Sequence, residues 1–503
     1  MTQLVAFSFL VLFTVLMIVI GLKTAQKAKT IDGFLLGGRK IGPWISAFSY
    51  GTAYFSAVIF IGYAGRTGWT VGVGGIWIGI GNALLGCLLA WLLLARRTRH
   101  MTHNLHASTM PEFFEKRFGS KNMKLYAALI IFIFLVPYCA TVYKGLGYLF
   151  SQIFPIFGTH GDIVCMFIIA VLTAIYLVLG GYFATTITDF IQGIIMLFGV
   201  TVMVIVVVSN PVVGGFSDGF AKLKTIDPSL ISITGGSQWR FLLMNILLTS
   251  FGTLGLPQMI HKYYAIGDEK QIPKAAVVST VFALVIGVGA YTVGTFGRLY
   301  LNNTLPDGGN FDAVIPCMLM NALSGNVWTN IILSVILLLV LSASMSTLSS
   351  IVLTSSSAIA VDLLPVVVPD YNKKGQMILM RALCFVFIAA SFIFASFKVA
   401  FIMQLMSFSW GVVAGCFIGP YIWGLYSKKI SRAGVWCGLL SGLLVVGGCT
   451  LYVSLTDSFA AASNLSQNFG VAAMAISIIV TPLVSLFTQK SCPKEASSAF
   501  EGI

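Results

Sequence analysis

Two stretches of small polar residues interrupt long apolar segments of this 503-residue chain, and they are the residues best suited to bind a ligand. The tetrapeptide Ser49–Thr52 (Ser-Tyr-Gly-Thr) lies inside the apolar segment 41–65 and carries no charge. The tetrapeptide Ser250–Thr253 (Ser-Phe-Gly-Thr) lies inside the segment 239–257 and repeats nearly the same residues. Backbone without helical hydrogen bonds is tolerated inside a membrane only where it is buried in protein or lines a cavity. Both stretches therefore predict a broken helix whose freed carbonyls and hydroxyls face one site.

Such a pair of interrupted segments, in corresponding places of two halves, is typical of the binding site of a secondary transporter. The alternative interpretation is that the glycines and serines only let neighbouring helices pack closely. A single interrupted segment would leave these two interpretations about equally favoured. The near identity of the two tetrapeptides favours the binding site.

A serine-rich segment, 341–350, offers a third set of oxygen atoms. The hydroxyls of Ser346 and Thr347 are adjacent, and the carbonyl of Ala343 lies one turn earlier on the same helix face. Small hard cations prefer oxygen ligands of this kind. Close packing of a serine-rich helix explains the composition equally well. From this segment alone, both interpretations stay open.

Charged residues inside apolar segments are rare here, and Asp189 is the clearest example among the acidic residues. A charged side chain costs about 2.5–3.5 kcal/mol at the centre of a membrane helix, so it marks a functional site by default. We predict that Asp189 belongs to a cation pathway on the cytoplasmic side. The alternative is an interfacial carboxylate that caps a helix or pairs with a lysine. Lys144 is the corresponding basic residue, and its long side chain can instead extend to the interface.

Composition identifies an all-α integral membrane protein. The chain is 57% hydrophobic and only 9% charged, whereas soluble domains contain about 25% charged residues. The net charge of +14 does not indicate a nucleic-acid partner, because Lys and Arg gather at the ends of apolar segments as orientation signals do. The nine cysteines show no spacing typical of a metal site or a disulfide framework. No grouping of His, Asp and Ser within the segments predicts an enzyme.

Thirteen apolar segments are long enough to cross a bilayer, which predicts a multi-pass protein of the plasma (inner) membrane. They are 4–22, 41–65, 70–95, 124–152, 162–181, 185–209, 239–257, 274–297, 327–360, 376–395, 399–425, 433–455 and 467–487. Most of the 30 Lys and Arg residues fall in alternate connections if the N-terminus lies outside. The positive-inside rule therefore predicts an outside N-terminus and a cytoplasmic C-terminus.

The segments divide into two groups of five, and each group opens with an interrupted segment. Because five is odd, the second group is inverted in the membrane relative to the first, which predicts a 5+5 inverted repeat. The predicted organisation is listed here in chain order: 1–40 as a peripheral helix and cytoplasmic loop, 41–209 as repeat 1, 210–238 as an extracellular loop, 239–425 as repeat 2, 426–487 as peripheral helices and 488–503 as a cytoplasmic tail.

Several motifs resemble those of the sodium/solute symporters, a family that includes proline, pantothenate and monocarboxylate carriers. The motifs are Leu36–Arg39 followed by Gly42-Pro43, Thr188–Gln192, Gly255–Gln258 and Met345–Ser349. The resemblance implies a LeuT-type fold with sodium as the coupling ion and no prosthetic group. It implies a sodium site at Thr52, Phe55, Ala343, Ser346 and Thr347, with Asp189 near the inner sodium exit.

The substrate is less well defined by this resemblance. In proline carriers the position of Tyr54 is an aspartate, and those of Thr249 and Thr253 are a tryptophan and a tyrosine. The segment 252–257 is more similar to acetate and pantothenate carriers, whereas Pro43 and 138–140 are similar to proline carriers. We predict a substrate site between the two broken helices and the segment 404–410, from the residues Ser49, Gly51, Tyr54, Ser56, Thr249, Thr253, Pro257, Gln404, Ser407 and Trp410.

The sequence thus predicts a sodium-coupled symporter that imports a small organic solute, with a carboxylate, by alternating access. Proline or another amino acid, a short monocarboxylate and a pantothenate-like compound all remain candidates. The expected partners are this solute and the lipid bilayer, in a monomer or a weak oligomer. A proton-coupled carrier of the same fold, with Asp189 as the titrating group, is the first alternative. An ion channel is the second alternative, although no repeated filter sequence or ring of charges is present.

Overall fold

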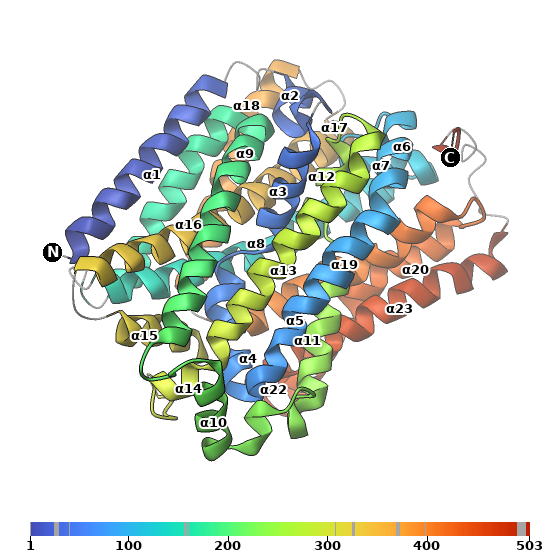
Figure 1. The fold of residues 1–503 in the computed structure, drawn as a ribbon. Helices are drawn as coiled ribbons and strands as arrows, with labels where there is room; N and C mark the ends of the chain where they lie inside the picture. The colour runs from blue at the N-terminus through green and yellow to red at the C-terminus, as the bar shows by residue number, and fades with distance from the viewer. Residues whose placement is uncertain are drawn as a thin grey trace.

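The computed structural model describes residues 2–24, 30–39, 41–154, 158, 160–306, 308–323, 327–368, 373–397, 399–489 and 499–502. Over these ranges the fold is helical, and extended pairing is limited to one bridge between Ile41 and Ile266. Within the same ranges, twelve helices are long and apolar enough to cross a membrane. They pack into one bundle in which segments distant in the sequence lie side by side (Figure 1). The expected all-α membrane fold is confirmed.

Eight long helices form most of the bundle. They are α1(Thr2–Thr24), α8(Lys121–Ile153), α9(Gly161–Ser209), α13(Ile272–Thr295), α16(Val327–Ser357), α18(Lys373–Ser396), α19(Ile402–Tyr426) and α23(Ser466–Phe487). α1 packs on α9 and α16 at the edge of the bundle, and several of its leucines and valines are exposed to the surroundings. α19 lies inside the bundle, and almost all of its residues are buried.

The first interrupted segment is a broken helix, as predicted. α3(Pro43–Tyr54) begins with a proline, whose fixed φ suits the first turn, and it ends at Phe55 in an extended conformation (φ −105°, ψ 119°). The chain becomes helical again in the π-helical turn η3(Val58–Tyr63) and continues into α4(Ala64–Val71). In the last α3 turn the carbonyl of Gly51 still accepts from the N–H of Phe55 over 3.2 Å, whereas the two-residue gap leaves the carbonyls after it without partners in their own helix.

The second interrupted segment is also broken, but it is longer than predicted. α11(Trp239–Gly252) is followed by tight turns, and Pro257 then opens a new helix, α12(Pro257–Tyr264). The prediction that this span ends at residue 257 was therefore wrong, because Pro257 starts a helix here and does not stop one. Lys262, which the sequence placed in a loop, is consequently buried within α12.

The break in 41–65 also explains why twelve membrane-length helices are found where thirteen segments were predicted. Each half of this segment is short, and its second half runs on into one apolar helical segment, Val58–Asn104. The predicted spans 162–181 and 185–209 form the single element α9, which bends at Gly181. Gly181 has a φ of +56°, which other residues rarely adopt.

The remaining elements connect the long helices or cover the ends of the bundle. The segment after α4 contains η4(Gly72–Gly75), α5(Ile76–Gly81), the π-helical turns η5(Asn82–Leu88) and η6(Trp91–Ala95), and α6(Arg96–Asn104). One end of the bundle carries α2(Ile31–Leu36), η2(Gly37–Arg39), α7(Met110–Phe118), η10(Glu269–Gln271), η12(Ala358–Leu363) and α17(Leu364–Val367) (Figure 1). The other end carries α10(Phe216–Ile226), η8(Pro228–Ile231), η9(Gly236–Gln238), α14(Gly297–Tyr300), η11(Phe311–Ala313), α15(Val314–Ala322) and α22(Phe459–Asn464). The chain closes with α20(Arg432–Gly442), η13(Leu443–Gly447), α21(Gly448–Thr456) and α23.

The predicted tail 488–503 is described only at residues 488, 489 and 499–502. Phe500 in this short piece lies against the guanidinium of Arg117, 5.0 Å from its ring centroid, and the side chain of Asn104 donates to the carbonyl of Glu501 over 2.9 Å. This piece of the tail therefore contacts the end of the bundle that carries α7.

Candidate functional site

An oxygen cluster lies where the end of α3 contacts α16. The hydroxyl of Ser346 donates to the carbonyls of Thr52 (2.9 Å) and Ala343 (3.0 Å). The hydroxyl of Thr347 lies 3.0 Å from the carbonyl of Ala343 and 3.3 Å from those of Thr52 and Ala53. We call these three carbonyls and two hydroxyls the oxygen cluster. All five residues are buried, so a cation held here would be shielded from water.

The chemistry of this cluster suits sodium. The carbonyl of Thr52 lies near the broken end of α3, and hydroxyls of the neighbouring helix approach it. The side-chain oxygen of Thr52 is buried and forms no hydrogen bond among the described residues. Neutral oxygens on two helices are ligands for a hard cation. Four of the five residues predicted for sodium supply this cluster, and the fifth, Phe55, lies in the break itself.

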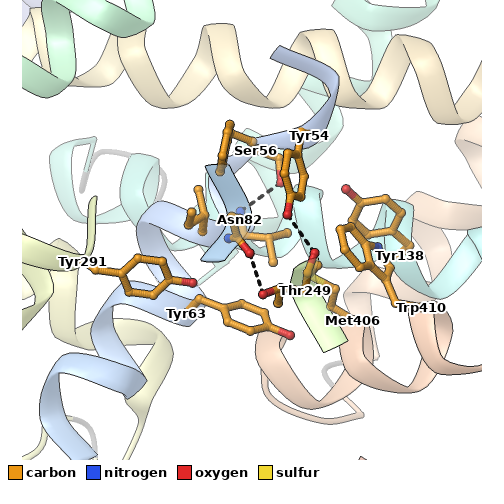
Figure 2. A pocket seen from close by; sticks show the side chains of 12 residues that line it. Tyr54, Ser56, Tyr63, Asn82, Tyr138, Thr249, Tyr291, Met406 and Trp410 are labelled. Atoms are coloured by element: carbon orange, nitrogen blue, oxygen red, sulfur yellow. Dashed lines mark hydrogen bonds between the residues drawn. The ribbon is translucent and has the colours of Figure 1, made fainter. Parts of the chain in front are cut away.

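A small central cavity lies beside the first break, and its lining begins at Tyr54, the residue after Ala53 of the oxygen cluster (Figure 2). Its volume is about 20 Å³, which is close to the space of one water molecule. Twelve residues line it: Tyr54, Phe55, Ser56, Val58, Ile59, Tyr63, Asn82, Tyr138, Thr249, Tyr291, Met406 and Trp410. They come from both broken helices and from α8, α13, α19 and η5. A solute larger than water can therefore enter only when these side chains move apart.

Polar contacts across the cavity join the two broken helices. The hydroxyl of Tyr54 donates to the carbonyl of Thr249 over 2.8 Å, and the hydroxyl of Thr249 donates to the side-chain oxygen of Asn82 over 2.7 Å (Figure 2). Ser250 donates to the same oxygen of Asn82 over 3.2 Å. Asn82 was not among the residues predicted from the sequence, although an amide within the apolar segment 70–95 was a usable signal.

Aromatic rings form one side of the cavity. The rings of Tyr54 and Trp410 are stacked with centroids 6.3 Å apart, and Tyr138 meets Trp410 edge-on at 5.6 Å. The indole N–H of Trp410 is buried and makes no hydrogen bond of ordinary geometry among the described residues. No charged side chain is among the twelve that line the cavity. Tyr63 and Tyr291, also absent from the predicted set, extend toward the cavity from the opposite side (Figure 2).

The ten residues predicted for the substrate lie in several places. Four of them line the central cavity: Tyr54, Ser56, Thr249 and Trp410. Ser407 is hydrogen-bonded to the cavity residue Tyr63 (3.1 Å), and Thr253 donates to the carbonyl of Gly86 (2.8 Å).

The other four lie farther from the cavity lining. Gly51 faces the ring of Phe282, and Pro257 begins α12. Ser49 contacts Asp189, whereas Gln404 lines a separate cavity of about 370 Å³ next to α22. Binding of the substrate by any of the ten remains a prediction.

Asp189 lies in a buried polar contact between three helices. Its carboxylate accepts from the hydroxyl of Ser49 on α3 over 2.6 Å, and the ammonium of Lys262 on α12 lies 3.4 Å away. Lys262 also donates to the hydroxyl of Ser49 over 2.8 Å. The side chains of Asp189 and Lys262 are 0% and 2% exposed. The carboxylate is therefore neutralised inside the bundle and does not face the interface.

Lys144, the other predicted charge within a span, is also buried and does not extend to the interface. Its ammonium lies 3.9 Å from the carboxylate of Asp312 and donates to the carbonyl of Ala400. Asp312 accepts from the backbone N–H of Ile402 over 3.0 Å, at the N-terminus of α19. Negative charge is stabilised at a helix N-terminus. These contacts fasten the connection before α15 to the start of α19.

Comparison with known proteins gives a consistent result. Residues 34–442 match the model of the sodium:solute symporter family. The chain is 26% identical over 498 residues to the osmoregulated proline transporter OpuE of Bacillus subtilis (strain 168), covering 98% of this chain and 96% of that protein. It is 27% identical over 436 residues to the sodium/proline symporter of Escherichia coli (strain K12), covering 86% and 84% of the two chains.

Solved structures show the same fold. A Na+-coupled sialic acid symporter in a substrate-bound outward-open state matches with a TM-score of 0.78 and 18% identity, over 96% of this chain and 97% of that one. Mhp1, a nucleobase-cation-symport-1 family transporter, matches with a TM-score of 0.55 and 14% identity, over 92% and 98%. At these identities the likeness concerns the fold alone.

Proposed function

The chain belongs to the sodium:solute symporter family, and we propose that the solute it imports with sodium is a small zwitterion of the proline type. As a member of this family it is a multi-pass membrane symporter that couples solute transport to sodium. One observation carries the proposal about the solute: the central cavity is aromatic and uncharged, and its lining begins at the residue next to an oxygen cluster suited to sodium. The named proline transporters among its relatives support the same class of solute.

The lining of the cavity favours a zwitterion over an anion. An ammonium group is attracted to the faces of tyrosine and tryptophan rings, and Tyr54, Tyr138 and Trp410 offer such faces. The indole N–H of Trp410 makes no hydrogen bond of ordinary geometry among the described residues, so it can donate to a carboxylate. A solute with both groups brings no net charge into a cavity without charged side chains. An acetate or pantothenate ion lacks the ammonium group that these ring faces would attract.

We assign the sodium ion to the oxygen cluster, in which Thr52 and Ala343 offer carbonyls and Ser346 and Thr347 offer hydroxyls. We also assign to it the carbonyl of Phe55, which lies beside the cluster in the break itself. The shared helix α3 gives the coupling, because it carries both the cluster residue Thr52 and the cavity residue Tyr54. An ion that draws the end of α3 toward α16 also fixes the position of Tyr54. Sodium and solute therefore stabilise the same arrangement of the broken helix, which is a coupling free energy between two sites.

The proposed orientation places the end of the bundle with α6 and α7 in the cytoplasm. This end carries Arg96, Arg97, Arg99, Lys116 and Arg117, as the positive-inside rule requires. Residues 41–209 and 239–425 then form the two inverted repeats that exchange conformations. Both sites are built within one chain, so we propose that a single chain suffices for transport in the plasma membrane.

Uptake by purified protein in liposomes tests the proposal. Radiolabelled proline, acetate and pantothenate are each offered with an inward sodium gradient or with choline in its place, at fixed pH. We expect proline to accumulate only with sodium, and the other two compounds to enter at background rates. Uptake of acetate or pantothenate in preference to proline would overturn the assignment of a zwitterionic solute. Uptake that persists in choline and follows a proton gradient would overturn the assignment of sodium as the coupling ion.

A further inference from the structure

The contact between Asp189 and Lys262 has no part in the proposed binding of sodium or solute, although it is the most deeply buried ion pair described. Both side chains are inaccessible, and a single hydroxyl, that of Ser49, bridges them at 2.6 and 2.8 Å. The ring of Tyr182 lies 5.3 Å from the ammonium. The second carboxylate oxygen of Asp189 forms no hydrogen bond among the described residues. One oxygen of the carboxylate thus remains free to take another cation.

The pair joins two structural units. Ile41, which precedes α3, is hydrogen-bonded through its backbone to Ala265 (3.3 Å) and Gly267 (3.2 Å), which follow α12. α3 and α12 are therefore tied together at one end, and Ser49 and Lys262 belong to this tied unit (Figure 1). Asp189 belongs to α9, outside the unit. Any movement of the tied helices away from α9 must separate Lys262 from Asp189.

Separation of Lys262 from Asp189 would leave two buried charges without their partners. Removing one partner of a buried ion pair is strongly destabilising, because the remaining charge is uncompensated. The mobile cation of this transporter is sodium, and its proposed oxygen cluster includes the carbonyl of Thr52, one helical turn along α3 from Ser49. The carboxylate of Asp189, which accepts from Ser49, therefore meets α3 one turn away from the cluster residue Thr52.

We propose that Lys262 is a built-in counter-cation that exchanges with sodium on Asp189 and so limits this symporter to one sodium ion per cycle. When the ammonium is on Asp189, the carboxylate is neutral overall and holds no second ion. When the tied unit moves, the departing sodium replaces the ammonium on the carboxylate. The return of Lys262 then displaces the ion, which makes its release favourable.

The proposal predicts a gain of a binding site when the lysine is removed. In Lys262→Met the carboxylate keeps Ser49 but loses its internal cation. We expect purified Lys262→Met protein in detergent to bind two sodium ions per chain at saturation, and the wild-type protein to bind one. Equilibrium binding of radioactive sodium counts the ions directly. The dependence of the melting temperature on sodium concentration gives the same number independently, because ions that bind only the folded state stabilise it.

Three controls define the outcome. Lys262→Arg keeps the cation and is expected to bind one ion, and the double variant Asp189→Asn, Lys262→Met lacks the carboxylate and is also expected to bind one. Lys270→Met removes an exposed lysine from the same end of the molecule and leaves the count at one. A count of one in Lys262→Met, or of two in the wild-type protein, would overturn the proposal.

The inference uses the sodium cluster proposed above, but its readout does not involve the solute. If the cluster itself were misassigned, Ser346→Ala, Thr347→Ala protein would still bind sodium, whatever the count in Lys262→Met. The two proposals therefore fail separately.

Discussion

The two breaks in the bundle begin with almost the same tetrapeptide, but they use their freed polar groups differently. At the first break, the carbonyls of Thr52 and Ala53 accept hydroxyls from α16, and the N–H of Ala57 donates to Ser344 on the same helix over 3.3 Å. At the second break, Leu254 and Gly255 donate back to carbonyls three residues earlier in their own chain, each over 3.0 Å. The polar backbone groups of the first break form hydrogen bonds with α16, whereas those of the second break form hydrogen bonds within their own segment.

This difference assigns separate roles to the two breaks. A carbonyl that meets only hydroxyls of another helix can exchange them for a cation, and the first break provides such carbonyls. The second break keeps its carbonyls within tight turns, and its side chains contact the neighbouring π-helical turn η5. Thr253 there donates to the carbonyl of Gly86, which also accepts from Tyr50 of the first break over 3.0 Å. The first break thus has the carbonyls suited to the proposed ion site, whereas the second broken helix contributes Thr249 to the lining of the central cavity.

The largest effect is expected from removing the hydroxyls opposite the first break. If each hydroxyl oxygen that coordinates sodium contributes as much as a hydrogen bond to a charged group, about 1.5–3 kcal/mol, loss of both Ser346 and Thr347 hydroxyls should lower sodium affinity roughly 100-fold or more. The measurement is the sodium concentration for half-maximal uptake by Ser346→Ala, Thr347→Ala protein in liposomes. The matched variant Ser250→Ala, Thr253→Ala at the second break should change it less than about threefold, since neither residue belongs to the cluster. Equal losses in the two variants would contradict the division of roles.

A smaller effect is expected from crowding Gly86, where the two breaks meet. A Cβ at this position would lie 2.2 Å from the hydroxyl oxygen of Tyr54 and 3.2 Å from the Cα of Ser250. Overpacking of this kind costs about 1–3 kcal/mol, and here it displaces the ring that lines the cavity. Gly86→Ala should therefore raise the proline concentration for half-maximal uptake about tenfold and leave sodium affinity nearly unchanged. Gly448→Ala, where a Cβ meets nothing within 4 Å, is the control.

The bond between Ala57 and Ser344 contributes to stability and not to ion binding. Ser344→Ala leaves the buried N–H of Ala57 without this partner, which costs about 1–3 kcal/mol. We expect a lower melting temperature in detergent at every sodium concentration. Ser342→Ala is the matched control two residues away, because the Ser342 hydroxyl has no hydrogen bond among the described residues. If both variants melted at the same temperature, the first break would not depend on this contact.

The smallest effect is expected from the hydroxyl of Tyr54. Its bond to the carbonyl of Thr249 contributes about 0.5–1.5 kcal/mol, so Tyr54→Phe should change proline affinity about three- to tenfold while keeping the ring. Tyr50→Phe removes one hydrogen bond to the carbonyl of Gly86, which still accepts from the hydroxyl of Thr253. Its effect on proline affinity should therefore be smaller still. Competition binding of proline to both variants measures the difference. A reversed order would place the solute nearer to Tyr50.

Local sequence predicted the broken helices well, because the glycines and hydroxyl residues that weaken a membrane helix are adjacent in the chain. The same holds for Ser346 and Thr347, which share one helix face with Ala343. Local sequence did not predict the burial of Lys262, since a proline within an apolar segment marks the end of one helix and the start of the next equally well. The burial of Lys262 follows from α12, whose existence depends on packing against α3.

The cavity was predicted only in part, because its lining comes from six helices. Asn82, Tyr63 and Tyr291 are single residues in apolar segments, and no local spacing indicates which neighbour they face. Gln404 was grouped with Trp410 because they share a segment, yet it is hydrogen-bonded to Asn464 (2.7 Å) at a different cavity. Contacts between distant segments decide such positions, and a single sequence does not contain them in a local form.

The absence of charged side chains from the lining of the central cavity has a consequence for the cell. If the solute is the proposed zwitterion and one sodium ion accompanies it, each turnover moves one positive charge inward, and transport then generates a current and responds to voltage. A membrane potential of 100 mV supplies about 2.3 kcal/mol per charge, enough to concentrate the solute about fiftyfold even without a difference in sodium concentration. A cell that loses its membrane potential would then lose most of its capacity to accumulate this solute.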